Sequence, residues 1–218
     1  MSNKYEEGIA FILEGDTEKE FYLSLLEFLC KKHDGILERQ LDCSNSPDII
    51  YTLKTPSRHL LIKFNTVNTV TQMPHSSRWF ISQCKNKHRD VGSCIVFLCY
   101  DLDNYKNDIT KCYEGDWVNL RTSLKKKAKA VHDIAAAADI EDIILSDIEG
   151  ISRFLGSPNT MALPTGSKGK AKLKKLFRQA NRTYHEGKRA RTLIDSLDMQ
   201  KIMDTSLAPL TMIESVIF

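Results

Sequence analysis

Acidic side chains stand directly after two apolar runs of this sequence. Glu14 follows the run Ile9–Leu13, and Asp101 and Asp103 follow the run Cys94–Tyr100. Because residues i and i+2 of a strand point to the same side, Asp101 and Asp103 are predicted to face one way. Carboxylate oxygens suit Mg²⁺ or Mn²⁺, and such ions activate water and stabilise charge on phosphate groups. The spacing therefore indicates metal-assisted phosphoryl chemistry.

These acids need strands that end at the same place. Ile9–Leu13 has the length of a strand buried on both faces, and Gly15 permits a turn after it. Thr17 and Glu20 have the spacing of a capping box, which places Glu18 in the first turn of a helix. β-Branched and aromatic residues make the run before Asp101 a central strand. In a parallel sheet both carboxyl ends face one mouth, where a cation would neutralise the repelling acids.

Structural explanations of these motifs stay open. The helix dipole alone favours Glu18 in a first turn, and Asp101-Leu-Asp103 also fits a turn that follows a strand. A zinc site built from cysteines and His88 is disfavoured. Cys94 and Cys99 flank a core strand, and residues five apart on a strand face opposite sides.

Composition places the chain among ordinary globular proteins. It has 218 residues, of which 42% are hydrophobic and 27% are charged. No apolar run approaches the ~18 residues of a membrane span, and no apolar leader follows the N-terminus. We expect a cytoplasmic protein with reduced cysteines and no membrane partner.

Positive charge is concentrated in one segment. The net charge is +3, but residues 168–191 hold ten basic residues and one acid, Glu186. Such a basic arm suits a polyanion, and nucleic acid is the predicted partner. Lys125, Lys126, Lys127 and Lys129 are instead expected to form a solvated helix face. The predicted nucleic-acid contacts are Lys168, Lys172, Lys175, Arg178, Arg182, Lys188, Arg189 and Arg191.

The two acidic motifs resemble a known family. Ile12-Leu-Glu14-Gly-Asp-Thr-Glu18 together with Phe97-Leu-Cys-Tyr-Asp101-Leu-Asp103 is similar to the TOPRIM (topoisomerase–primase) domain, over about residues 7–105. The form with Glu18 is most similar to the bacterial anti-phage branch, which includes nucleases of the overcoming-lysogenization-defect type. The resemblance implies a compact, Rossmann-like α/β fold with about four mainly parallel strands flanked by helices.

The resemblance also implies roles for individual residues. Glu14 would be a metal ligand or general acid/base, and Asp101 and Asp103 would be metal ligands of one or two Mg²⁺ or Mn²⁺ ions. Glu18 matches a second carboxylate. A third acid is expected beyond the second motif, with Glu149 or Asp147 as candidates. A lysine that helps with the phosphate is expected among Lys168, Lys170 and Lys172.

Two parts are predicted: a TOPRIM-like α/β domain over 1–135 and a helical, basic C-terminal extension over 136–218. The implied function is a metal-dependent nuclease that cuts DNA or RNA in phage defence or abortive infection. The alternative is a non-catalytic TOPRIM module that binds nucleic acid or a protein partner. Relatives often carry an ATPase on the same chain, and no Walker motif occurs here. A separate ATPase or regulator subunit is therefore a further predicted partner.

Overall fold

A single six-stranded sheet forms the centre of the molecule. The computed structural model describes residues 4–41, 49–102, 114–166 and 168–218. The strand order is β2-β3-β4-β1-β5-β6. The strands are β1 (Tyr5–Leu13), β2 (Ile36–Leu41), β3 (Ile49–Lys54), β4 (His59–Thr66), β5 (Val91–Asp101) and β6 (Ala130–Ala136).

The sheet is mostly parallel. Strand β1 pairs in parallel with β4 and β5, and β5 pairs in parallel with β6. Strand β3 runs antiparallel to both β2 and β4. The predicted α/β class with a mainly parallel sheet is confirmed, but the sheet has six strands where about four were expected. Of the antiparallel pair, β3 falls in the stretch 48–53, whose sequence fits either a strand or a short helix, and β2 lies just before it.

The register of the parallel strands brings their carboxyl ends to one edge. Leu13, the last residue of β1, lies opposite Cys99, so Glu14 follows the strand close to Asp101, the last residue of β5. Asp101 in turn lies opposite Ala136, the last residue of β6. The segments that follow β1, β5 and β6 therefore leave the sheet at the same place.

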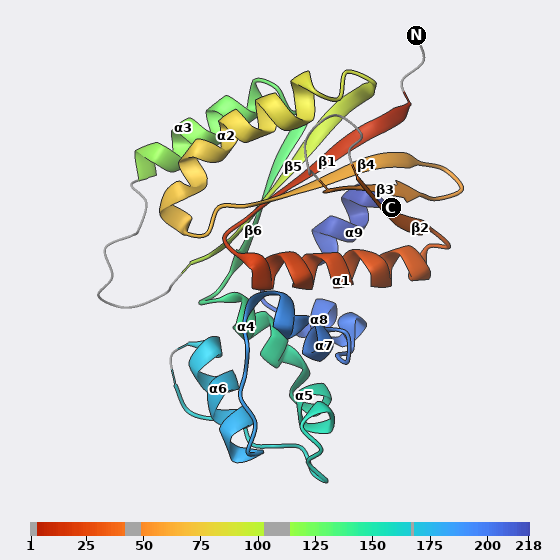
Figure 1. Cartoon of the computed structure of the whole chain (residues 1–218). Coiled ribbons are helices and arrows are strands. Elements are labelled where there is room, and N and C mark those ends of the chain that lie inside the picture. Colours follow the sequence, from red (N-terminus) through yellow and green to blue (C-terminus); the bar gives the residue numbers. More distant parts are fainter. Residues whose placement is uncertain (1–3, 42–48, 103–113, 167) are drawn as a thin grey trace.

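Alternate residues of β1 face two apolar layers. Ile9, Phe11 and Leu13 contribute to the cluster that contains α1 (Asp16–Lys32), whereas Ala10 and Ile12 face the other layer. Figure 1 shows α1 on one side of the sheet and α2 and α3 on the opposite side. The opposite layer consists of η1 (Val70–His75), α2 (Ser76–Trp79), a π-helical turn (Phe80–Asn86) and α3 (Glu114–Lys125).

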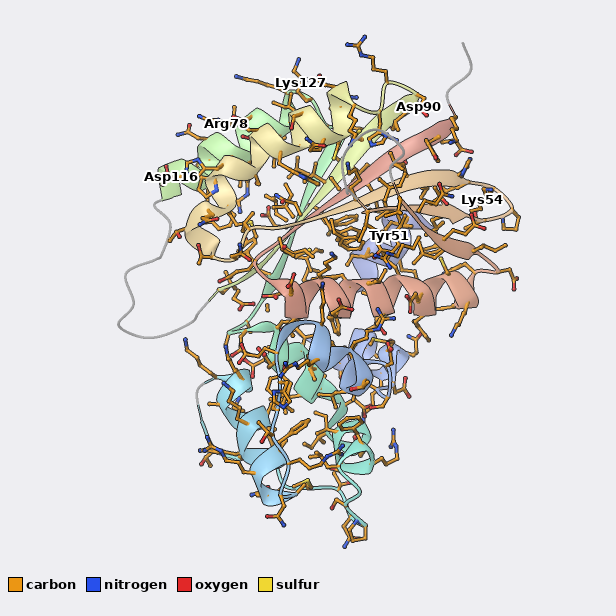
Figure 2. All side chains as sticks on the ribbon, viewed as in Figure 1. Tyr51, Lys54, Arg78, Asp90, Asp116 and Lys127 are labelled. Carbon is orange, nitrogen blue, oxygen red and sulfur yellow. The ribbon has the colours of Figure 1, made fainter. Side chains whose placement is uncertain are left out.

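The outer surface of this second layer is charged. Figure 2 shows Arg78, Asp116 and Lys127 at its outer surface, and all three residues are exposed. Lys125, Lys126 and Lys127 are exposed as predicted, but α3 ends at Lys125, and Lys129 forms an ion pair with Glu7 at 2.6 Å.

The C-terminal helices pack beyond α1, on the side away from the sheet, apart from α9, which lies beside the sheet (Figure 1). Leu173, Ile194 and Ile213 belong to the same apolar cluster as Phe11 and Leu25, so the core continues past the predicted boundary at residue 135. These helices are α4 (Ile140–Ile144), η3 (Leu145–Asp147), α5 (Ile148–Phe154), α6 (Gly169–Gln179), η4 (Gly187–Ala190), α7 (Arg191–Ile194), α8 (Met199–Thr205) and α9 (Thr211–Ile217).

The spacing of Leu173, Leu176 and Phe177 predicts a helix from Lys172 to Tyr184. Helix α6 instead begins at Gly169 and ends at Gln179. The chain turns at Asn181, whose φ of 55° is left-handed, and continues as an extended segment to η4. Among the described residues, no helix is both long enough and apolar enough to cross a membrane.

Candidate functional site

The end of β1 and the end of β5 place two carboxylates together. The backbone N–H of Asp101 points at Glu14, with its nitrogen 3.5 Å from Oε2. The predicted convergence of these residues, almost ninety positions apart in the sequence, is therefore confirmed. Asp103, the second acid of the Asp101 motif, lies outside the described residues.

Glu18 joins them from the first turn of α1, but the predicted capping box does not form. The helix begins at Asp16 with Gly15 at the N-cap and no side-chain cap. Thr17 is already inside the helix and cannot cap it; its Oγ1 instead accepts a hydrogen bond of 2.8 Å from the N–H of Gly187. Glu18 is 8% exposed, so this turn presents a carboxyl group that is largely removed from water.

That hydrogen bond gives a first testable result. Replacing Thr17 by valine keeps the shape of the side chain but leaves the N–H of Gly187 without its acceptor, at a cost of about 1–2 kcal/mol in the free energy of unfolding. Urea denaturation measures this loss. Thr17→Ser retains the acceptor and should recover most of it; equal losses in both variants would contradict the role given to the hydroxyl.

Two further acids reach the site from the segment after β6. Asp139 caps α4, with Oδ1 accepting from the N–H of Asp142 at 3.1 Å, while Oδ2 accepts from the N–H of Lys170 at 3.1 Å. One carboxylate thus serves the N-termini of two helices, where negative charge is favoured. Gly169 allows this approach, because a Cβ there would lie 2.4 Å from Oδ1 of Asp139.

Glu141 lies one turn into α4 and is 4% exposed. Its Oε1 accepts a hydrogen bond of 3.0 Å from the hydroxyl of Tyr184. No motif in the sequence indicated Asp139 or Glu141. The available signal was their position, because acids that follow a strand parallel to β5 emerge at the same edge of the sheet.

These groups line one open pocket of about 420 Å³, which we call the acidic cleft. Its central acids are Glu14, Glu18, Asp101, Asp139 and Glu141. Lysines contribute from the start of α6, and the segment around Gly187 closes one side. The complete lining is Glu14, Gly15, Asp16, Thr17, Glu18, Asn68, Asp101, Asp139, Ile140, Glu141, Lys168, Lys170, Glu186 and Gly187.

Burial and mutual repulsion keep protons on these acids. Burial, followed by the charges of Glu18 and Glu14, raises the pKa of Asp101 to about 9. Burial also raises the pKa of Glu18 to about 7, with a contribution from Glu14. Burial and the charge of Asp139 raise the pKa of Glu141 to about 7. At neutral pH the cleft therefore holds a mixture of carboxylates and carboxylic acids.

Glu149, the predicted third acid, does not reach the cleft. It lies in the first turn of α5 and forms an ion pair with Lys201 of α8. The alternative candidate, Asp147, is 1% exposed and caps α5, accepting from the N–H of Gly150 at 3.1 Å and of Asp198 at 2.9 Å. Both acids fasten α5 to α8, and the acids that reach the cleft from beyond β6 are Asp139 and Glu141.

The basic segment is largely engaged within the protein. Lys170 and Lys174 pair with Glu186, and Lys172 pairs with Asp142 at 3.3 Å. Arg191 binds acids of α1 and Asp195, while Lys175 and Arg182 donate to the backbone carbonyls of Thr165 and Phe154. Lys168 lines the cleft, and Arg178, Lys188 and Arg189 are exposed. Acids of the protein therefore neutralise Lys170, Lys172, Lys174 and Arg191, whereas the exposed Lys175 and Arg182 bind neutral carbonyl groups and keep their charge.

The metal prediction can be compared with the geometry. Within residues 4–41, 49–102, 114–166 and 168–218, no group of three or more His, Cys, Asp or Glu side chains is placed to hold a metal ion. The cleft acids are gathered at one edge, but they do not form a closed coordination shell by themselves.

Comparisons with known proteins name no family. No family model and no curated protein matches the chain. Among solved structures, the chain is similar to the Campylobacter jejuni 5'-methylthioadenosine/S-adenosyl homocysteine nucleosidase, at 13% identity and a TM-score of 0.29, covering 97% of this chain and 99% of that one. The corresponding Neisseria meningitidis enzyme, in complex with methylthio-immucillin-A, gives 9% identity and a TM-score of 0.30, with 96% and 98% covered.

The prediction of a metal-dependent nuclease is wrong on these findings. No family model and no curated protein supports a nuclease, and Lys172 and Arg191, two of the predicted nucleic-acid contacts, are paired with acids of the protein itself. The identities and TM-scores are too low to give this chain a nucleosidase activity in its place. Nucleic acid and a separate ATPase subunit stay predictions.

Proposed function

We propose that this chain is a TOPRIM-type module whose acidic cleft binds a divalent cation, Mg²⁺ or Mn²⁺, and with it the phosphate group of a ligand. The observation that carries the proposal is the convergence of Glu14, Glu18, Asp101, Asp139 and Glu141 in one open pocket. All of their donor atoms are carboxylate oxygens, the hard donors that these cations prefer.

The electrostatics of the cleft favour a cation. The acids raise one another's pKa values, so an ionised cleft is unfavourable until positive charge enters it. Mg²⁺ usually keeps several waters and takes only one or two carboxylates together with phosphate oxygens. The cleft does not offer a closed shell of three protein ligands, which agrees with the small number of carboxylates that Mg²⁺ takes. The phosphate group of the bound molecule would complete the coordination.

Lysines at the rim of the cleft supply positive charge for the phosphate group of the ligand. Lys168 and Lys170 line the same pocket as the acids, at the start of α6. Ammonium groups beside a bound cation suit a phosphate group, because phosphate oxygens accept charge-assisted hydrogen bonds. The proposal is limited to a phosphate group at the cleft, because Lys168 and Lys170 are the basic residues that line it.

The test is a titration of the full chain with Mn²⁺, followed by electron paramagnetic resonance of the free ion. We expect Asp101→Asn and Glu14→Gln to weaken Mn²⁺ binding at least about tenfold each, because each removes one charged donor from the cleft. Glu149→Gln is the matched control and should bind as the wild-type protein does. Equal affinity in all four proteins would overturn the proposal.

A second candidate function is a hydrolase that acts by general acid–base catalysis. It is favoured by one observation: Glu18 and Glu141, which line the same cleft, both have a pKa of about 7, where a carboxyl group can donate or accept a proton. Hydrolysis of p-nitrophenyl phosphate with a pH profile that bends near 7, and its loss in Glu141→Gln, would support this role. A rate equal to that of buffer alone would exclude it for this class of substrate.

A further inference from the structure

We infer that Lys170 and Lys174 form an anion-binding fork that the protein's own Glu186 occupies, and that this carboxylate gives way when a phosphate-bearing ligand enters the cleft. The inference rests on the proposed function and deepens it, since it names the phosphate subsite and an internal competitor for that subsite.

The fork has a defined geometry. Lys170 and Lys174 are four positions apart on α6 and therefore lie on the same side of the helix. Nζ of Lys170 lies 2.5 Å from Oε2 of Glu186, and Nζ of Lys174 lies 3.0 Å from Oε1. Each ammonium group thus holds a different oxygen of one carboxylate, which is the arrangement that two oxygens of a phosphate group would take.

The fork opens onto the acidic cleft. Lys170 and Glu186 both line that pocket, beside Asp139 and Glu141. The charges of Glu186, Glu141 and Asp139 raise the pKa of Lys170 against the effect of its burial, so its ammonium group stays charged. An anion on the fork would therefore lie next to the carboxylates proposed to hold the cation.

The backbone holds Glu186 at this position independently of its side chain. Gly187 follows it with a φ of 65°, a left-handed conformation that favours glycine, and its N–H donates to Oγ1 of Thr17. The carboxylate can leave the fork by side-chain rotation while this bond keeps the segment attached to α1. Removing the carboxylate should therefore change anion binding without detaching the segment.

The contact is weak enough to be displaced. The side chains of Lys170, Lys174 and Glu186 are 41%, 41% and 40% exposed, and exposed ion pairs contribute little to stability. A phosphate dianion carries more charge than a carboxylate and offers more acceptor oxygens, so it competes well for two ammonium groups. The fork therefore selects for ligands with a terminal phosphate over ligands with a single negative charge.

The experiment measures binding of inorganic pyrophosphate to the full chain by calorimetry, with EDTA in one arm and Mn²⁺ in the other. Glu186→Gln empties the fork, and we expect its affinity for pyrophosphate to be about three- to tenfold higher than that of the wild-type protein in both arms. Lys174→Gln should lower the affinity. Asp142→Asn is the matched control, because Asp142 forms an ion pair with Lys172, which lies on α6 together with Lys170 and Lys174. Removing this charge should change the pyrophosphate affinity by less than about twofold.

The outcomes separate this inference from the function on which it rests. Unchanged pyrophosphate affinity in Glu186→Gln, with Mn²⁺ binding intact, would overturn the fork and leave the proposed function standing. If Glu186→Gln binds pyrophosphate more tightly in EDTA but the protein binds no Mn²⁺, the fork is supported and the proposed cation site is ruled out. Glu186→Asp, whose shorter side chain cannot reach both lysines, provides a second variant with a carboxylate, and it should show an intermediate gain.

Discussion

Asp101→Asn should stabilise the cation-free protein at pH 8 by at least about 3 kcal/mol. Burial and the neighbouring acids raise the pKa of Asp101 to about 9, whereas the unfolded chain has the ordinary value near 4. Between these pH values the folded protein binds a proton that the unfolded chain has released, so the free energy of unfolding falls as pH rises from about 4 towards 9. Asparagine carries no such proton and removes the loss.

Urea denaturation at pH 5 and pH 8 in EDTA tests this expectation. The wild-type protein should be less stable at pH 8, and the difference should shrink strongly in Asp101→Asn. Asp116→Asn is a suitable control, since Asp116 is exposed on α3, in the layer beyond the other face of the sheet (Figure 2). If the two variants have the same pH dependence as the wild-type protein, Asp101 does not hold its proton in the folded state.

Mn²⁺ affinity should rise about tenfold per pH unit between pH 6 and pH 8, or about a hundredfold over the range. The proposed cation needs ionised carboxylates, but Asp101, Glu18 and Glu141 have pKa values of about 9, 7 and 7 and hold protons in this range. Each bound ion must displace at least one proton, so protons compete with the cation most strongly at the acidic end.

Calorimetry in two buffers of different ionisation enthalpy counts the protons released as Mn²⁺ binds. We expect at least one at pH 7 for the wild-type protein and fewer for Asp101→Asn. Glu149→Gln should release as many as the wild-type protein, because Glu149 is paired with Lys201 away from the cleft. Affinity that does not vary with pH would mean that the ion binds somewhere other than among the raised-pKa acids.

Local sequence patterns were sufficient to predict that Glu14, Glu18 and Asp101 belong to one site. The apolar runs before Glu14 and Asp101 formed adjacent parallel strands, as their composition predicted, and the register then placed both acids at one edge. Glu18 followed because one turn of helix separates it from Glu14. Strand β2 was missed because it is almost entirely exposed and carries no apolar alternation, whereas the stretch that forms β3 fits either a strand or a short helix.

The contribution of Asp139 and Glu141 to the site depends on packing between distant segments. Asp139 and Glu141 read as ordinary residues at a helix start, and only the parallel pairing of β6 with β5 brings them to the cleft. The short helices after residue 140 gave several equivalent places for a third acid, and Glu149 was chosen among them without a tertiary constraint. The ion pairs of the basic segment could not be foreseen for the same reason, because partners such as Glu20 and Glu27 lie on α1, more than 160 residues away.

The bond between Thr17 and Gly187 joins positions 170 residues apart. During synthesis the first five strands and α1 leave the ribosome long before the segment that closes the cleft. The nascent chain therefore carries Glu14, Glu18 and Asp101 for many seconds without Lys170 beside them, at the elongation rates of about 5–20 residues per second typical of cells. Protons or cations from the solvent would balance these acids in that interval, so the ionic conditions during synthesis bear on how readily this protein folds.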